Sequence, residues 1–362
     1  MRPEHLSILA CPRSGRPLVL GDRPVREGSR VKEGVLIEPR SGASYVIKDF
    51  IPRFVAHEDY AANFGLEWTI HSRTQYDEHS GFPVSQERFE RDTRWGQDLR
   101  GEVILEVGSG SGRFTSSALK TGATIVSIDY SRAVEANYRS NGSHENLLLV
   151  QASVYEMPFR RNYFTKAFCL GVLQHTPDPR EAFMSIVRHV KPGGSIAADV
   201  YTKSLRMWLL NTKYWVRPLI DRSDPRALYD KVKRYVDLMW PLVRLVRNIP
   251  GLGVRLPSRL LILDYSRLIP KADDTTLKEW ALLDTFDMLS PTYDKPQTPK
   301  AFRRWFEEAG LTEIDVRASR QSKSTTVGTA VREQPRAAVG TPPGGVRASK
   351  YPDGRPRDVG VA

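Results

Sequence analysis

The most constraining feature of this chain is the run Val103-Ile-Leu-Glu-Val-Gly-Ser-Gly-Ser-Gly112, where an apolar stretch leads straight into a glycine-rich turn. A helix-forming stretch, residues 113–120, follows at once. Glycines at positions 108, 110 and 112 have no β-carbon, so a ligand can approach the backbone of the turn closely. The run therefore predicts a strand, a ligand-binding loop and a helix in succession.

A second apolar run, residues 124–128, ends on Asp129, seventeen residues after Gly112. An acid at the end of the next strand suits hydrogen bonds to a ribose diol, as in nucleotide-binding α/β folds, which indicates a ligand that contains adenosine. A dinucleotide site would need the spacing Gly-x-Gly-x-x-Gly, and the Glu106 carboxylate would repel its pyrophosphate. S-adenosylmethionine carries an ammonium, a sulfonium and a ribose without phosphate, so the electrostatics favour it.

On these residues, the stretch 101–201 resembles a class I S-adenosylmethionine-dependent methyltransferase of the small-molecule type. Glu106-x-Gly108-x-Gly110-x-Gly112 matches the first motif of that family and Asp129 the second, while residues 151–159, 170–179 and 190–194 occupy the later landmarks in order. The resemblance implies S-adenosylmethionine as cofactor and no metal. It implies these cofactor-binding residues: Glu106, Gly108, Gly110, Gly112, Asp129, Tyr130, Ser153, Val154 and Leu170.

Two positions depart from the family pattern. Ser153 stands where the family usually has an acid near the adenine amino group, and a neutral acceptor is roughly half as strong as a charged one. The strand before the fourth motif begins at Phe164 rather than at an aspartate. Weaker cofactor binding, or a catalytically silent relative, therefore stays open.

Apolar runs alternate with helical stretches through the centre of the chain. Strands are expected near 103–107, 124–128, 147–151, 166–171 and 195–201, with a closing hairpin near 312–318 and 323–330. This alternation predicts an α/β fold with a Rossmann-like doubly wound sheet, mostly parallel with a terminal antiparallel hairpin. Ligands of such sheets bind beyond the carboxyl ends of the strands.

The 362 residues exceed one typical domain, and five segments are expected. Residues 1–56 resemble a small β-rich zinc-ribbon domain, but only Cys11 remains of its ligands, because Ser14, Glu38 and Ser41 stand at the other positions; a metal-free module is expected. Residues 57–100 are a helical lead-in over the cofactor, where Trp68, Thr74 and Gln75 are candidates to line the pocket. The methyltransferase core spans 101–202 and 291–331.

The two remaining segments carry most of the net charge of +12. Residues 203–290 form an inserted helical cap, whose part 203–271 contains 15 Lys and Arg against 5 Asp. Residues 332–362 form a tail in which 10 of 31 residues are Gly or Pro, so disorder is expected there. A local basic surface facing an anionic partner or substrate is predicted.

One group is needed to accept the proton of the methyl acceptor, because alignment and desolvation supply much of the rate of an in-line displacement. His175, just past the fourth strand, is the candidate general base, and a histidine that caps the following turn is the structural alternative. Gln174 beside it, and Asp284, Asp287 and Tyr293 on the return from the cap, are candidate substrate-binding residues.

The leading hypothesis is a methyltransferase acting on a small molecule, a sugar, a lipid-linked precursor or a secondary metabolite. Alternatives are an RNA methyltransferase that uses the basic insertion, and a catalytically silent binding partner. Nucleic acid is disfavoured, because no aromatic motif for base amino groups follows the fourth strand. No apolar stretch is long enough to span a bilayer or to act as a secretory signal, so a cytoplasmic location is expected, with peripheral membrane contact through 203–290 possible.

Overall fold

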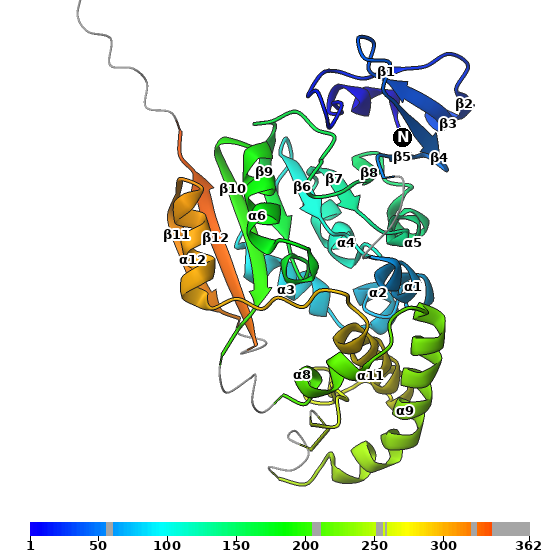
Figure 1. The fold of residues 1–362 in the computed structure, drawn as a ribbon, viewed down its shortest axis with the longest axis vertical. Coiled ribbons are helices and arrows are strands. Elements are labelled where there is room, and N and C mark those ends of the chain that lie inside the picture. Colours follow the sequence, from blue (N-terminus) through cyan, green and yellow to red (C-terminus); the bar gives the residue numbers. More distant parts are fainter. Residues whose placement is uncertain (56–60, 205–210, 251–255, 258, 320–323, 335–362) are drawn as a thin grey trace, which may run out of the picture.

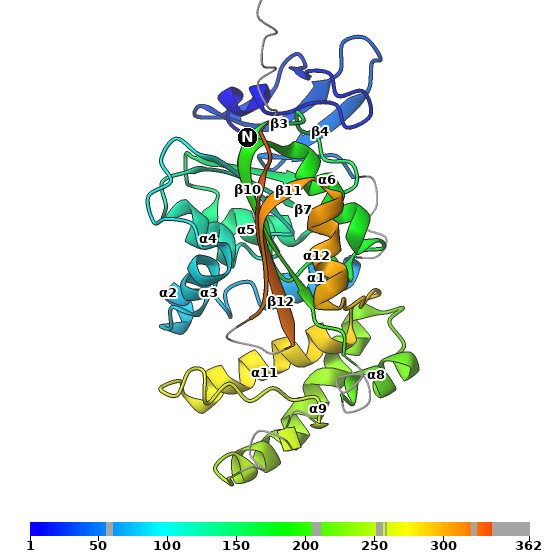
Figure 2. The same ribbon diagram turned by 90° about the vertical axis from the view of Figure 1, so that its left-hand side faces the viewer.

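The computed structural model describes residues 1–55, 61–204, 211–250, 256–257, 259–319 and 324–334. Its centre is one mixed β-sheet with helices on both faces (Figure 1 and Figure 2). The tail predicted to be disordered lies outside the described residues from position 335 onward.

The strands lie in the order β1-β3-β4-β5-β8-β7-β6-β9-β10-β12-β11, with β2 paired to β3. The strand bounds are β1 Val19–Leu20, β2 Val25–Glu27, β3 Arg30–Ile37, β4 Ser44–Lys48, β5 Ile51–Arg53, β6 Val103–Val107, β7 Thr124–Asp129, β8 Leu147–Gln151, β9 Phe164–Cys169, β10 Val190–Tyr201, β11 Leu311–Ala318 and β12 Thr325–Arg332. Strands β8, β7, β6, β9 and β10 run parallel, and β12 pairs antiparallel with both β10 and β11. The predicted Rossmann-like sheet with a terminal antiparallel hairpin is confirmed.

Strand β10 is the strand that differs most from its predicted bounds. It begins at Val190, five residues early, and its register with β9 shifts between Val190 and Ser195. Gly193 lies in this irregularity with φ 78°, a conformation that favours glycine. The Pro-Gly-Gly sequence therefore bends the start of the strand without ending its pairing.

The helical elements are α1 Ala62–Ile70, α2 Asp77–Ser80, α3 Val84–Thr93, α4 Arg113–Leu119, α5 Ala133–Asn141, α6 Pro179–His189, α8 Lys213–Val216, α9 Pro225–Val246, α11 Asp274–Leu289 and α12 Pro299–Glu308, with 3-10 turns η1 Pro3–Ser7, η2 Leu173–His175 and η3 Arg217–Leu219. Helices α3, α4 and α5 pack in the apolar core on one face of the sheet, and α6 and α12 pack in the core on the other (Figure 2). No helix among the described residues is long and apolar enough to cross a membrane.

Three of these helices begin with the same local signal. Asp178, Asp224 and Thr298 each precede a proline and accept hydrogen bonds from backbone N–H groups of the first helical turn. A capping side chain followed by proline satisfies the first free donors of a helix while the proline ring fixes φ. The starts of α6, α9 and α12 are therefore encoded locally.

The N-terminal strands are joined to the central sheet rather than set apart from it. Arg53 of β5 pairs in parallel register with Gln151 of β8, and its guanidinium donates to Gln151 Oε1 at 2.8 Å. The same guanidinium forms a 3.1 Å ion pair with Glu135 of α5. Strand β5 thereby joins the N-terminal strands to the end of β8 at the edge of the parallel sheet.

Two turns of this N-terminal region share one hydrogen-bond pattern. The N–H of Gly15 donates to the carbonyl of Cys11 at 2.8 Å, and the N–H of Gly42 donates to the carbonyl of Glu38 at 2.9 Å. Cys11 and Glu38 each also donate their own N–H to the carbonyl five residues later. The two segments, Cys-Pro-Arg-Ser-Gly and Glu-Pro-Arg-Ser-Gly, are thus repeated turns.

Helices α8, α9 and α11 form a cap with its own apolar core. Val232, Val236 and Trp240 of α9 pack against Trp280 and Phe286 of α11. Leu66 and Ile70 of α1, and Phe82 and Val84 at the start of α3, complete this cluster. In Figure 1 the cap lies next to the end of the β10 arrow, on the side where the parallel strands terminate. The cap therefore covers the edge of the sheet where ligands of such folds bind.

Candidate active site

The glycine loop after β6 is held against the end of β7. Gly108, Gly110 and Gly112 all adopt positive φ values, of 78°, 53° and 95°. The N–H groups of Gly108 and Ser109 both donate to the carbonyl of Ile128, at 2.8 and 3.1 Å. Left-handed backbone at three positions favours residues without a β-carbon, so the sequence pattern agrees with the shape of the loop.

Asp129 connects this loop to the second strand. Its Oδ2 accepts the N–H of Gly110 at 2.8 Å, and its Oδ1 accepts from the N–H and hydroxyl of Ser131 at 2.8 and 2.7 Å. Burial raises the pKa of the Asp129 carboxyl, while these donors act in the opposite direction. A carboxylate oxygen can accept two bonds, so Oδ2 keeps capacity for a ligand hydroxyl.

Glu106 lies beneath the loop rather than on its surface. It is 1% exposed, and its carboxylate accepts a 2.5 Å hydrogen bond from Thr115 of α4. Burial raises its pKa to about 7, and Asp129 adds to this rise. Glu106 therefore titrates near neutrality and responds to any positive charge that binds close to the loop.

The loop rests on a polar network that the sequence analysis missed. Asn141 of α5 donates to the Tyr76 hydroxyl at 2.9 Å, to the carbonyl of Gly112 at 3.1 Å and to Asn137 at 2.8 Å. Asn137 in turn donates to Thr115 at 2.8 Å, and a β-carbon on Gly112 would lie 2.2 Å from its Oδ1. The only available signal was the four-residue spacing of two asparagines on one helix, which is common on solvated faces as well.

The other cofactor residues implied by the resemblance follow strands β7 to β9. The backbone carbonyl of Tyr130 accepts from Gln151, and the hydroxyl of Ser153 accepts the N–H of Tyr155 at 3.2 Å. The N–H of Ala152 donates to the carbonyl of Asp129, so the ends of β7 and β8 are tied together. Val154 and Leu170 are 6% and 5% exposed and pack on opposite faces of the sheet.

The segment after β9 is fixed by a buried ion pair. The N–H of Gly171 donates to Asp199 Oδ1 at 2.6 Å, and Asp199 Oδ2 accepts from Arg88 of α3 at 2.7 Å. Burial raises the pKa of Asp199, and Arg88 opposes that effect. Next to Gly171, Val172 packs against Gly108, which joins this segment to the glycine loop.

The helical lead-in covers the loop from above. The Trp68 indole of α1 lies 3.0 Å from the point where a β-carbon on Gly110 would stand. Gln75, 7% exposed, hydrogen-bonds to Asp284, whereas Thr74 bonds to Glu279 and His71 and faces the cap. Trp68 thus lies against the glycine loop, and Gln75 lies beside Asp284 of the cap.

His175 has one nitrogen engaged and one free. Its Nδ1 lies 3.0 Å from the backbone carbonyl of Tyr293, which can only accept, so Nδ1 carries the proton. Nε2 is then the basic nitrogen, and it is buried without a hydrogen-bonding partner among the described residues. Burial lowers the pKa of His175, which keeps the ring neutral at neutral pH. Gln174 is fully buried, and neither atom of its amide has a partner in the described part of the chain.

Asp284 and Asp287 of α11 meet a further carboxylate, Glu67 of α1, and we call these three residues the acidic cluster. Glu67 is fully buried, and burial together with Asp287 and Asp284 raises its pKa well above the ordinary value. Burial and Asp287 raise the pKa of Asp284 to about 7. Arg113, the first residue of α4, interacts with all three members and links the acidic cluster to the glycine loop.

These surroundings suit S-adenosylmethionine better than a dinucleotide. Asp129 offers an acceptor for a ribose, and the carboxylates near the loop favour an ammonium and a sulfonium over a pyrophosphate. Buried polar atoms without partners at Glu67, Gln174 and His175, within the described part of the chain, are the atoms that a bound polar ligand would satisfy. No group of three His, Cys, Asp or Glu among the described residues is placed to hold a metal ion.

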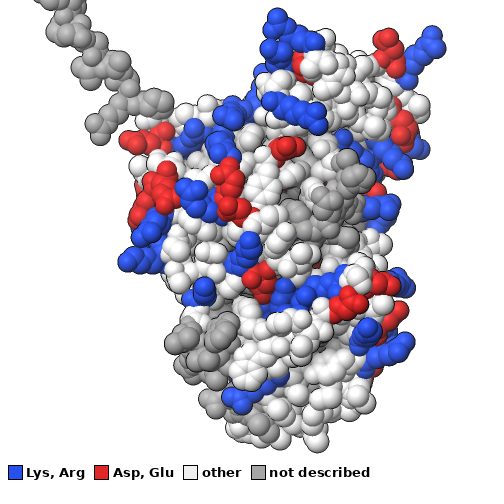
Figure 3. Space-filling model, in the orientation of Figure 1, with Lys and Arg blue, Asp and Glu red and all other residues white. Residues whose placement is uncertain are grey.

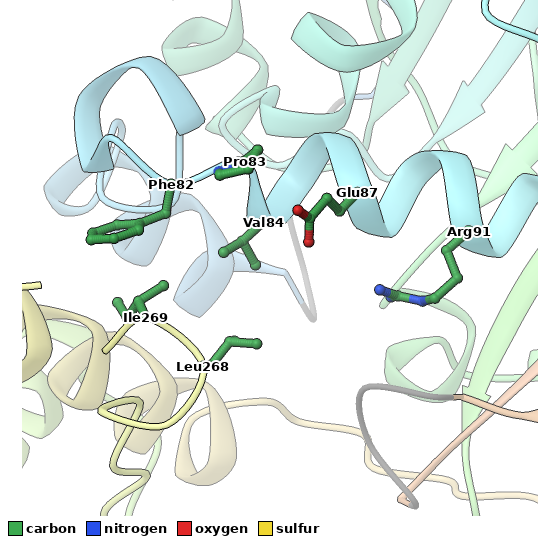
Figure 4. A pocket seen from close by; sticks show the side chains of 7 residues that line it. All are labelled: Phe82, Pro83, Val84, Glu87, Arg91, Leu268 and Ile269. Carbon is green, nitrogen blue, oxygen red and sulfur yellow. The ribbon is translucent and has the colours of Figure 1, made fainter. Parts of the chain in front are cut away.

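A separate pocket of about 300 Å³ lies where α3 meets the cap (Figure 4). Phe82, Val84, Leu268 and Ile269 form its apolar end, and Glu87 and Arg91 extend along α3. Pro83 completes the lining, so the site residues predicted from the sequence contribute nothing to its wall in the described structure. The pocket is a feature of the boundary between core and cap.

Comparison with known proteins bears on the central part of the chain. Residues 105–198 match the family model described as a methyltransferase domain. Ubiquinone biosynthesis O-methyltransferase of Erwinia tasmaniensis is 28% identical over 144 residues, covering 38% of this chain and 57% of that protein. The protein of the same description from Pseudomonas putida is 30% identical over 125 residues, covering 31% of this chain and 50% of its own length. The chain thus spans about half the length of these relatives.

Among solved structures, an O-methyltransferase family protein from Burkholderia thailandensis aligns with a TM-score of 0.40 and 12% identity, covering 69% of this chain and 57% of the other. A similarity at that level carries no argument about function. The matched stretch contains the glycine loop and Asp129. It also contains most residues of the parallel strands β6 to β10. Residues 105–198 of this chain are therefore similar to a methyltransferase domain.

Proposed function

We propose that this protein transfers a methyl group from S-adenosylmethionine to a small-molecule acceptor, such as a sugar, a lipid-linked precursor or a secondary metabolite. The observation that carries the proposal is the glycine loop held by Asp129, with buried unpaired polar atoms beneath the cap. When bound, S-adenosylmethionine supplies the electrophilic methyl carbon. The chain supplies alignment, exclusion of water and a proton acceptor.

We assign the proton acceptor to Nε2 of His175. The carbonyl of Tyr293 fixes the tautomer through Nδ1, and the Phe64 and Tyr201 rings lie 5.3 and 5.4 Å from the imidazole. Gln174, Asp284 and Asp287 are assigned to the acceptor, and Tyr293 acts through its backbone. His175→Gln should then reduce kcat about 100-fold or more with little change in cofactor affinity.

A direct test uses methyl-labelled S-adenosylmethionine with a metabolite extract and, separately, with total RNA. The proposal requires label in a small-molecule product that is absent with His175→Gln. Label in RNA would favour the alternative acceptor, and label in neither fraction despite cofactor binding would favour a silent binding partner.

RNA is the less favoured acceptor because the cap uses many of its cations internally. Lys213 pairs with Asp294, Arg247 with Asp264 and Lys233 with Asp237. On the face that Figure 3 presents, acidic and basic side chains are interspersed rather than gathered in one basic patch. Binding of RNA that falls steeply with salt would count against this assignment.

Contact with a membrane surface is a second proposal, carried by one face of α9. Leu238, Leu242 and Leu245, at helical spacing on α9, are 76%, 37% and 75% exposed, and Ile249, just beyond the end of the helix, is 43% exposed. Leucines beside exposed basic residues suit the headgroup layer of an anionic bilayer. Sedimentation with phosphatidylglycerol vesicles tests this: Leu238→Ser with Leu245→Ser should abolish binding, and the matched pair Val25→Ser with Val46→Ser should not.

We also propose the domain boundaries given above, with residues 1–56 as a metal-free derivative of a zinc ribbon. The two repeated turns support this, because in each the first side chain interacts with the serine three residues on: Cys11 with Ser14 and Glu38 with Ser41. Hydrogen bonds then replace metal–ligand bonds. Metal analysis of the purified protein should find no stoichiometric zinc, and bound zinc would overturn this interpretation.

A further inference from the structure

The acidic cluster contains more carboxyl groups than the cations around it can pair, and burial favours the protonated forms of Glu67 and Asp284 when no cation is bound. Glu67, Asp284 and Asp287 converge from α1 and α11, and Arg113 is the one cation that interacts with all three in the described structure. Arg88 also interacts with Asp284, but its guanidinium is paired with Asp199 at 2.7 Å and with Asp92 at 3.4 Å. A positively charged ligand could therefore replace the protons that these carboxyl groups hold.

Several buried polar atoms in and beside the acidic cluster also lack a hydrogen-bonding partner among the described residues. Both carboxylate oxygens of Glu67 are buried without a partner among the described residues, although the side chain is fully excluded from solvent. The same holds, within that part of the chain, for the Gln174 amide and for Nε2 of His175. An unsatisfied buried polar group costs about 1–3 kcal/mol, more when charged, and such groups are found where a ligand completes the bonding.

Two aromatic residues, Tyr201 and Phe64, connect His175 to the acidic cluster. The Tyr201 hydroxyl donates to Asp287 at 3.4 Å, and the Tyr201 ring contacts the imidazole edge to face. Phe64, one turn before Glu67 on α1, also contacts the imidazole, with the ring centroids 5.3 Å apart. Carboxylates beside aromatic rings are a favourable setting for an ammonium group.

The carboxylates of the acidic cluster affect a nitrogen acceptor and an oxygen acceptor of the methyl group in opposite ways. When an amine attacks a methylsulfonium, positive charge moves from sulfur to nitrogen, and neighbouring carboxylates stabilise that change. When a hydroxyl is methylated, it must develop negative charge, which the same carboxylates oppose. The acidic cluster thus favours nitrogen over oxygen as the atom that accepts the methyl group.

We propose that the methyl acceptor is an amine, received as its ammonium form by Glu67, Asp284 and Asp287; this inference rests on the methyltransferase function proposed above. The ammonium gives one proton to Nε2 of His175. The nitrogen lone pair then forms the bond to the methyl carbon, and the carbon–sulfur bond breaks with its electron pair passing to sulfur. The products are a methylated ammonium and neutral S-adenosylhomocysteine.

The test compares two ligands of the full chain by calorimetry. S-adenosylhomocysteine is neutral at sulfur, whereas in sinefungin a carbon bearing a primary ammonium replaces the methylsulfonium, so that its ammonium stands where the methyl group faces the acceptor. Sinefungin should bind at least about tenfold more tightly. Glu67→Gln, Asp284→Asn and Asp287→Asn should each reduce that advantage and leave the affinity for S-adenosylhomocysteine unchanged.

Asp237→Asn is the matched control, because Asp237 is a cap carboxylate that pairs with Lys233 and Lys278 at the surface. It should leave the ratio of the two affinities unaltered. Equal affinities for the two ligands, or a ratio insensitive to all three acidic-cluster variants, would overturn the assignment of an amine. Failure of S-adenosylhomocysteine to bind at all would instead remove the proposed methyltransferase function on which it rests.

Discussion

Gly108 of the glycine loop lies directly against Val172 after β9: a β-carbon on Gly108 would stand 2.3 Å from Val172 Cγ2. Two segments that are 64 residues apart in sequence are thereby packed backbone to side chain. The glycine is required twice, by its positive φ and by this contact, and both requirements can be measured.

Gly108→Ala should destabilise the protein by about 2–5 kcal/mol, since left-handed backbone costs an L-residue about 1–2 kcal/mol and overpacking adds about 1–3 kcal/mol. Urea unfolding measures this. Gly171→Ala is the matched control, because Gly171 has φ 79° with open space around its β-position, and it should cost about 1 kcal/mol.

Adding Val172→Ala to Gly108→Ala should recover part of the loss, because it removes the atoms that clash. Equal costs for Gly108→Ala and Gly171→Ala would show that packing against Val172 is unimportant.

The asparagine network beneath the loop makes a second prediction. Asn141→Ala removes three hydrogen bonds, to Tyr76, Gly112 and Asn137, and leaves buried groups unpaired. A loss of about 2–4 kcal/mol in unfolding free energy and weaker cofactor binding are expected. Arg139→Ala, an exposed position on the same helix, should change stability by less than about 0.5 kcal/mol. Unchanged cofactor affinity in a destabilised Asn141→Ala would mean that the network does not shape the loop.

A third prediction concerns pH and Glu106. Its folded pKa of about 7 lies above the ordinary value of 4.5, so the folded state binds the proton more strongly. The raised pKa stabilises the folded state by its full amount, about 3 kcal/mol, below about pH 4.5. This stabilisation is lost as the pH rises through 7. The side chain of Glu106→Gln cannot ionise. The unfolding free energy of this variant, measured with urea, should therefore rise relative to that of the wild type by about 3 kcal/mol between pH 4.5 and 8. A difference independent of pH would contradict the buried carboxyl, and Glu87→Gln serves as the exposed control.

The fourth prediction concerns the ion pair that fastens the cap. Asp294 pairs with Lys213 at 2.6 Å, with side chains only 3% and 6% exposed. Asp294→Asn leaves a buried ammonium uncompensated and should cost about 3–5 kcal/mol, whereas Asp294→Asn with Lys213→Met should recover most of it. Thermal unfolding measures both variants. A double variant as unstable as Asp294→Asn alone would argue against a pairwise role.

The sequence predicted the central strands well because each is an apolar run bounded by a strong local signal. Strands β6 and β8 have the predicted bounds, and β7 extends one residue further to include Asp129. The helix α12 begins after Thr298 and ends before Gly310, two residues that mark helix ends locally. The predicted bounds of β9 and β10 were less accurate. Glycines near the start of β10 permit a register shift that the sequence pattern does not indicate.

Contacts between distant segments were beyond prediction. Glu67 lies 217 residues before Asp284, and nothing local indicates that α1 and α11 meet. The polarity of Asp284 and Asp287 indicates substrate contact, whereas Glu67 is only one residue of the predicted helical lead-in. The basic surface stays a prediction, and counting charges along 203–271 does not reveal that Lys213 and Arg217 both face Asp294.

The most direct test of the account is calorimetric binding of S-adenosylmethionine to the full chain, with nicotinamide adenine dinucleotide as the comparison. The account predicts one site with a micromolar dissociation constant, weakened about 10- to 100-fold by Asp129→Ala, and no measurable binding of the dinucleotide. Absence of S-adenosylmethionine binding, or preference for the dinucleotide, would contradict it.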